Sequence, residues 1–434
     1  MRSTFSRSIL PCRLIPLVYV AATIALAFTL PPFEYKFLPN LSHAMTTTSA
    51  IAIFSSIASG MIALTGIVFS LAFVMIQFSS SAYSPRLVTW FSESPTIFHS
   101  LGLFCATFIY ALACLGWVNR LGSKTVPFLS TWVVIILLVC SVFALVLLIR
   151  DLSNLQVTRI LQLIGHSGQD AIRKTYTTKD LLPFEEGFED RPQVGEQASA
   201  TQTLYYFGEP LIITAIDTGA LVRLAKRAGG LIVLHCATGE TLMQGQPLLQ
   251  IFSSRIRLPE SALAAPLKLG RERTFQQDSK YAIRLLVDIA IKALSPAIND
   301  PTTAVQAIDQ IEDLLRRLVG HNLKNGRVRD EDGVLRLIFP TPDWDDFLSL
   351  AFDEISFYGA TSLQVMRRLR ATLADLSEIA EEHKKRSIQS FLEHLDYLIS
   401  QSFTEKRYRS IARRQDRQGL GLSRRRAWEV GPGG

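Results

Sequence analysis

Lys292-Ala-Leu-Ser-Pro-Ala-Ile-Asn-Asp-Pro-Thr-Thr-Ala304 is the stretch that decides the fold of the second half of the chain. Apolar residues recur at helical spacing on both sides of it, from Ile283 to Ala293 and from Val305 to Leu318. Pro296 predicts the end of the first helix, because its ring clashes with the preceding turn. Asp300 is the expected N-cap of the second helix and Pro301 its first residue. Ser295, Asn299 and Asp300 are therefore predicted to lie on a short polar elbow between two helices.

The composition divides the chain into two halves. Its 434 residues are enough for two or three domains. Mean hydropathy is +0.23, and the apolar residues concentrate before Arg150. No two of the five cysteines have metal-ligand spacing, so we expect them to be reduced. The net charge of +7 has a local source, since the segment 405–426 carries nine Lys or Arg residues against two acids.

Four apolar segments before residue 150 satisfy the rule of about 20 apolar residues per transmembrane helix. They are Leu14–Leu30, Ile51–Phe78, Ile97–Val118 and Phe128–Ile149. The first could be a cleavable signal peptide, but the spans that follow favour an uncleaved anchor. No Asp, Glu, Lys or Arg lies inside these four segments, which argues against a proton relay.

The charges flanking the spans predict the orientation. An even number of spans places both termini on one side of the membrane. That side would carry Arg2, Arg7, Arg13, Arg86, Arg150 and Arg159, and the other side Lys36, Arg120 and Lys124. The excess of Lys and Arg favours cytoplasmic termini.

The second span has a stripe of small residues, namely Ser59, Gly60, Ala63, Gly66 and Ser70. Such spacing lets helix backbones approach closely. Two interpretations remain open. The stripe could serve packing within a four-helix bundle, or it could form an oligomer seam or the wall of a narrow pore.

The second half is predicted to be an α+β cytoplasmic domain. Residues 1–150 form the α-helical four-span membrane domain, 151–182 a connecting amphipathic helix and 183–203 a flexible acidic linker. Residues 204–403 should hold a small β-unit and a helix-rich C-terminal part. Predicted strands are 211–216, 230–236 and a hairpin at 327–329 and 334–339, with helices at 218–228, 345–358, 361–382 and 384–403.

The final segment, 404–434, is a basic tail with few apolar anchors. It is expected to lie in solvent, or alternatively to contact anionic lipid.

Several short motifs resemble one known family. They are Arg273-Thr274, Gln277-Asp278, Leu286-Val-Asp-Ile-Ala290 and Ala293–Ala304, together with Tyr83-Ser-Pro-Arg-Leu87 and the turn 239–248. The chain resembles a bacterial family of predicted membrane proteins, the domain-of-unknown-function family twenty-two fifty-four. The resemblance implies a multi-pass protein of the bacterial inner (plasma) membrane with a cytosolic domain. It implies no activity and no substrate.

The sequence carries no recognisable catalytic signature. It has no G-x-S-x-G elbow, H-E-x-x-H motif, phosphate loop or C-x-x-C pair, and we expect no metal, no cofactor and no nucleic-acid partner. The remaining candidate ligand or ion site is a polar set consisting of Arg273, Gln277, Asp278, Ser295, Asn299 and Asp300. The alternative is that these residues only cap helices and form turns.

Three classes of function stay open. The first is an oligomeric channel or transport-associated protein. The second is a membrane-anchored sensor or scaffold that binds a ligand or partner through its cytoplasmic domain. The third, a membrane-bound enzyme, ranks last for want of a nucleophile or a metal set.

Overall fold

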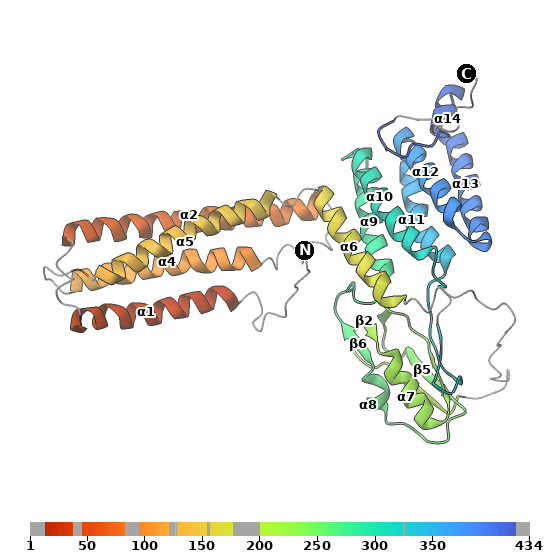
Figure 1. Cartoon of the computed structure of the whole chain (residues 1–434), viewed down its shortest axis with the longest axis horizontal. Coiled ribbons are helices and arrows are strands. Elements are labelled where there is room, and N and C mark those ends of the chain that lie inside the picture. The colour runs from red at the N-terminus through yellow and green to blue at the C-terminus, as the bar shows by residue number, and fades with distance from the viewer. Residues whose placement is uncertain are drawn as a thin grey trace. The chain divides into compact units, whose positions relative to one another are not determined.

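The computed structural model describes residues 14–37, 46–82, 95–120, 126, 128–153, 157–176, 200–323 and 326–421. The chain divides into two compact units, Met1–Gln156 and Val157–Gly434. The predicted class, a four-span helical domain followed by an α+β domain, is confirmed (Figure 1).

The first unit contains four long apolar helices. They are α1 (Ile15–Phe37), α2 (Thr47–Ala82), α4 (Pro95–Arg120) and α5 (Phe128–Ser153). Their candidate spans are Ile15–Glu34, Thr47–Val74, Pro95–Val118 and Phe128–Arg150. Helix α4 packs against the other three, so 44% of its span is buried, compared with 17% for each of the others. It is therefore the central helix of this unit.

The first span ends with a buried acid, Glu34, which lies beyond the predicted end of this span at Leu30. Helix α1 continues through Pro31 and Pro32, and Glu34 is only 1% exposed. One carboxylate oxygen of Glu34 accepts from the backbone N–H of Leu129 at 2.7 Å, and the other from that of Ser130 at 3.2 Å. These N–H groups begin α5, where a negative charge is favourable. Glu34 thus joins α1 to α5 as a helix cap.

The β part of the second unit consists of two small sheets. A five-stranded sheet has the order β1-β5-β3-β8-β7, and a three-stranded sheet has the order β4-β2-β6. All pairs are antiparallel except β3 and β8. The strands are β1 (Gln202–Tyr205), β2 (Leu211–Ile216), β3 (Leu231–Leu234), β4 (Thr241–Leu242), β5 (Pro247–Phe252), β6 (Leu267–Gly270), β7 (Arg327–Arg329) and β8 (Leu335–Ile338).

Helix α7 (Thr218–Ala228) packs on this β part and coincides with its prediction. Asp217 caps its first turn by accepting from the Ala220 N–H at 2.9 Å. Gly229 ends it with φ +68°, a conformation that favours glycine. Leu221, Ala225 and Ala228 bury its apolar stripe in one core with both sheets. The short helix α8 (Glu260–Ala264) lies nearby.

The helical part holds α6 (Val157–Thr175), α9 (Ser279–Ala293), α10 (Pro301–Leu318), α11 (Trp344–Gly359), α12 (Leu363–Ile379), α13 (Glu382–Ser402) and α14 (Lys406–Ala412). Helix α10 packs against α6, α9 and α12. Helix α6, predicted as a connecting helix, buries one face against α9 and α10. Helix α6 therefore packs as part of the second unit, which begins at Val157.

Two other segments are more structured than the sequence suggested. Gln202, which was predicted to lie in the acidic linker, is buried. Its side-chain amide donates to the carbonyl of Leu258 and accepts from the N–H of Leu258.

Part of the basic tail folds onto α12. Arg417 donates to Asp375 at 2.7 Å, and Arg413 donates to Asp396 of α13 at 3.0 Å. Residues 404–421 therefore belong to the folded unit, because acids on neighbouring helices neutralise these arginines.

Substitution of Gly168 should test the packing of α6. A Cβ atom at Gly168 would lie 2.7 Å from the Ala282 Cβ and 2.9 Å from Leu314. Gly168→Val should therefore lower the free energy of unfolding by about 1–3 kcal/mol through overpacking. Gly320→Val is the control, because no atom lies within 4 Å of its Cβ position. Equal denaturation midpoints for the two variants would mean that α6 does not pack in this way.

Candidate functional site

The elbow between α9 and α10 has the predicted caps. Asp300 accepts from the Thr303 N–H at 3.1 Å and from the Thr303 hydroxyl at 2.6 Å, and Pro301 is the first residue of α10. Asn299 has φ +48°, and its N–H donates to the Ser295 carbonyl at 2.9 Å. Helix α9 ends at Ala293, three residues before Pro296. The elbow is thus a tight turn closed by its own backbone, with an exposed Asn299 and a half-buried Ser295.

The other half of the predicted set lies at the start of α9. Gln277 accepts from the Ile216 N–H at 2.9 Å and so ties this segment to the end of β2. Asp278 caps α9, with Oδ1 accepting from the Tyr281 N–H at 3.1 Å. Arg273 and Gln277 are exposed, whereas Asp278 is only 2% exposed.

The structure does not bring the two halves together. Ser279–Ala293 is 15 residues long, which at a rise of 1.5 Å per residue separates its ends by roughly 22 Å. Arg273, Gln277 and Asp278 are at one end, and Ser295, Asn299 and Asp300 are at the other. A single ligand touching all six residues is excluded by this distance, so two separate places must be considered.

Of these two places, the one around Asp278 has a buried polar atom without a hydrogen-bond partner in the described part of the chain. Its Oδ2 atom is buried and has no hydrogen-bond partner among the described residues, and the same holds for Thr274 Oγ1. Gly239, with φ +87°, lies directly against it: a Cβ atom there would be 2.2 Å from Oδ2. Burial raises the pKa of the Asp278 carboxyl, while Lys280 and Arg273 act in the opposite direction. A buried, unsatisfied oxygen is costly, so this carboxyl is the candidate binding group of the second unit.

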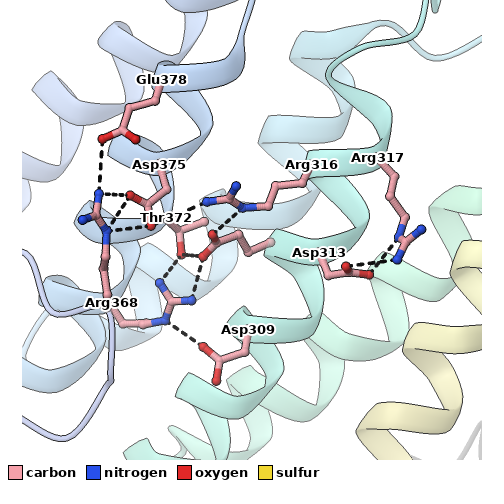
Figure 2. A network of polar contacts seen from close by, with 10 residues as sticks. Asp309, Asp313, Arg316, Arg317, Arg368, Thr372, Asp375 and Glu378 are labelled. Atoms are coloured by element: carbon pink, nitrogen blue, oxygen red, sulfur yellow. Dashed lines mark hydrogen bonds and ion pairs between the residues drawn. The ribbon is translucent and has the colours of Figure 1, made fainter.

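A larger polar cluster between α10 and α12 was not predicted (Figure 2). Arg368 donates to Glu312 at 2.6 Å, to Asp309 at 2.7 Å and to Thr372 at 2.9 Å. Glu312 also accepts a hydrogen bond from Nε of Arg316 at 2.8 Å. Burial alone would lower the pKa of Arg368, but Glu312 and Asp309 together raise it. The four-residue spacing of Glu312 and Arg316 indicates an ion pair along one helix face. Nothing in the local sequence indicates the partners of these residues on α12.

The end of α10 is capped by a distant lysine. Lys384 of α13 is buried, and its Nζ donates to the carbonyls of Val319 at 2.6 Å and His321 at 2.9 Å. Burial lowers the pKa of Lys384. A cation at the carbonyl end of a helix complements the helix dipole, which explains its position.

The five small residues of α2 lie on its exposed side. Ser59, Gly60, Ala63, Gly66 and Ser70 are all exposed in the single chain, and no atom lies within 4 Å of a Cβ position at Gly60 or Gly66. The buried side of α2 instead carries Phe54, Ala58, Met61 and Val68. Among the described residues of this unit, no helix therefore packs against the small residues.

Fold and site together define a class: a multi-pass membrane protein with an appended α+β unit, in whose described residues no cluster of metal ligands occurs. The chain belongs to the family of predicted membrane proteins DUF2254, whose model matches residues 12–375. Helices α13 and α14 and the segment after them follow the matched region.

Two curated relatives match most of the chain and are named as uncharacterized. They are the uncharacterized protein Rv1290c of Mycobacterium tuberculosis and the uncharacterized protein Mb1321c of Mycobacterium bovis. Each is 26% identical over 359 residues, which cover 80% of this chain and 68% of the relative. No solved structure matches the chain.

Removing one partner of the buried cluster should be strongly destabilising. Arg368→Met removes the cation that Glu312 and Asp309 share and leaves Glu312 with only the more exposed Arg316 as a cation. Breaking a buried ion pair costs about 3–5 kcal/mol. Arg317→Met is the control, because Arg317 pairs with Asp313 at 3.0 Å on the exposed side of α10. Its loss should be below about 1 kcal/mol. Urea denaturation of the two variants measures the difference, and similar midpoints would contradict a buried role for Arg368.

Asp278→Asn should stabilise the second unit at neutral pH by about 1 kcal/mol, because it removes an unsatisfied buried charge and keeps the cap. The folded pKa of Asp278 is raised above 3.8, so the protonated carboxyl supports folding at low pH and this support is lost as pH rises through that pKa. The gain should therefore shrink toward about pH 4.

Asp300→Asn is the matched control for the pH series, since both oxygens of Asp300 already accept hydrogen bonds. It should produce no stabilisation at any pH. Melting temperatures between pH 4 and 8 measure both variants, and a loss of stability in Asp278→Asn at pH 7 would contradict the assignment.

Proposed function

We propose that the chain is a homo-oligomeric channel or transport-associated protein of the bacterial inner membrane, with both termini in the cytoplasm. One observation carries this proposal: the small-residue face of α2 has no partner among the residues that the structure describes. At 100° per residue, this face points away from the side that carries Phe54, Ala58, Met61 and Val68. The orientation of the termini rests on the charges that flank the spans.

The chemistry of the bilayer favours a second copy of the chain as the partner of this small-residue face. Lipid tails are as apolar as leucine, so a small residue facing lipid contributes little, whereas small residues facing another helix permit close van der Waals packing. Helix α2 has 36 residues and no charged side chain, so it is roughly 54 Å long and exceeds the hydrocarbon thickness. Several such helices meeting along their small faces would form a narrow, uncharged passage.

Disulfide crosslinking in native membranes tests the seam. In a chain whose own cysteines are replaced, Ala63→Cys should form a dimer on oxidation, because Ala63 lies on the exposed small face. Ala58→Cys is the matched control: the same residue type on the same helix, but buried within the chain. It should stay monomeric. Equal yields for both variants, or no dimer from Ala63→Cys, would contradict the proposal.

A second candidate function is a membrane-anchored sensor or scaffold. It is supported by the buried, unpartnered Oδ2 of Asp278, which lies against the Gly239 turn near the Arg273 guanidinium. In this proposal a ligand or partner would supply the missing donor at the start of α9. Contact of the tail with anionic lipid remains a separate proposal for Arg424, Arg425 and Arg426, which lie outside the described residues.

A further inference from the structure

An exposed basic surface lies where α7 ends on the β part. Helix α7 contributes Arg223, Lys226 and Arg227, and the loop after β5 contributes Arg255, Ile256 and Arg257, all exposed. The two segments are joined: the Arg255 N–H donates to the Ala228 carbonyl at 2.9 Å. The Arg255 side chain also comes within 3.4 Å of a Cβ position at Gly229. We call these six residues the α7 basic surface.

Most of this charge is not neutralised by the protein. Lys226 pairs with Asp332 at 2.8 Å. Within the described part of the chain, Arg227, Arg255 and Arg257 form no ion pair with an acidic side chain. By contrast, Arg413 and Arg417 of the C-terminal segment pair with Asp396 and Asp375. Part of the charge in the C-terminal segment is therefore neutralised by the fold, whereas among the described residues Arg227, Arg255 and Arg257 are exposed without an acidic partner.

The loop presents an apolar residue between two arginines. Ile256 is 48% exposed and lies between Arg255 and Arg257. Its carbonyl accepts the Ser254 hydroxyl, and Ser253 has φ +55°. These contacts, with the bond from Arg255 to Ala228, hold the loop in one shape. Little entropy is then lost when the loop binds a surface.

We propose that the α7 basic surface binds the anionic surface of the membrane that the chain spans, with Ile256 entering the headgroup layer. The positive charges complement anionic headgroups, and each Lys or Arg near such a surface strengthens binding roughly fivefold. An apolar side chain among basic residues suits an interface that is charged outside and apolar beneath. The four spans keep the second unit close to lipid, so even a weak contact is well populated.

Binding of the α7 basic surface to lipid does not depend on a pore at α2. It requires only that the chain spans a bilayer, and it places no residue of the second unit against the first. A nucleic acid would also attract the arginines, but the exposed Ile256 favours lipid, because phosphate recognition has no need of an apolar side chain.

The test uses the full chain in nanodiscs, with the native cysteines replaced and an environment-sensitive fluorophore attached at Ile256→Cys. In phosphatidylcholine discs with about 30% phosphatidylglycerol, the emission should shift to the blue. Quenching by lipid-borne quenchers should be at least threefold greater than in pure phosphatidylcholine. Both effects should fall at about 0.5 M salt, since screening weakens exposed charges. A label at Phe357→Cys, an exposed position on α11, should show neither effect.

Charge reversal provides the matched control. Arg255→Glu with Arg257→Glu should abolish the phosphatidylglycerol response, whereas Arg386→Glu with Arg407→Glu, exposed on α13 and α14, changes the net charge equally and should preserve it. Hydrogen exchange of segment 253–258 in the unlabelled chain should slow only in anionic discs. Identical emission and exchange in both lipids would overturn the proposal, and so would a response to added RNA without one to lipid.

Discussion

The second unit depends on the way in which α10 begins and ends. Its start is set by the Asp300 carboxylate, which accepts from the Thr303 N–H, and its end by the Lys384 ammonium, which donates to two carbonyls beyond the last turn. Helix ends leave four backbone groups each without partners, so a buried helix needs such caps. With both ends fixed, α10 can present an apolar face to α6 and α9 and a charged face to α12.

Much of this arrangement could be predicted from local sequence. The caps at Asp300 and Pro301 follow from the rules for helix starts, and β2 and α7 occupy the predicted residues because alternation and helical periodicity are local signals. The four spans also emerge from hydropathy alone, although α1 extends beyond its predicted end. The helix continues through Pro31 and Pro32 to Phe37, and Glu34 in this extension accepts from the first N–H groups of α5, a distant contact that hydropathy does not reveal.

The candidate site was predicted less well, for a reason of geometry. The six polar residues are close in sequence, but the 15-residue helix α9 separates Asp278 from Asp300. The partners of Arg368, Arg417 and Lys384 were invisible for a related reason. Each pairs with a residue dozens of positions away, and local periodicity carries no information on such pairs.

The distribution of unpaired charge on the surface cannot be obtained by counting charged residues in the sequence. The segment 405–426 accounts for the net charge of +7, yet two of its arginines lie in ion pairs with acids of α12 and α13. The α7 basic surface contributes no unusual excess to any sequence window, because Arg223, Lys226 and Arg227 are distant in sequence from Arg255 and Arg257. Only the fold brings them together, and among the described residues it pairs Lys226 with Asp332 but leaves Arg227, Arg255 and Arg257 without an acidic partner. What a charged partner meets is therefore decided by which cations the fold leaves without an acid, and in the described part of this chain Arg227, Arg255 and Arg257 beside Ile256 are among them.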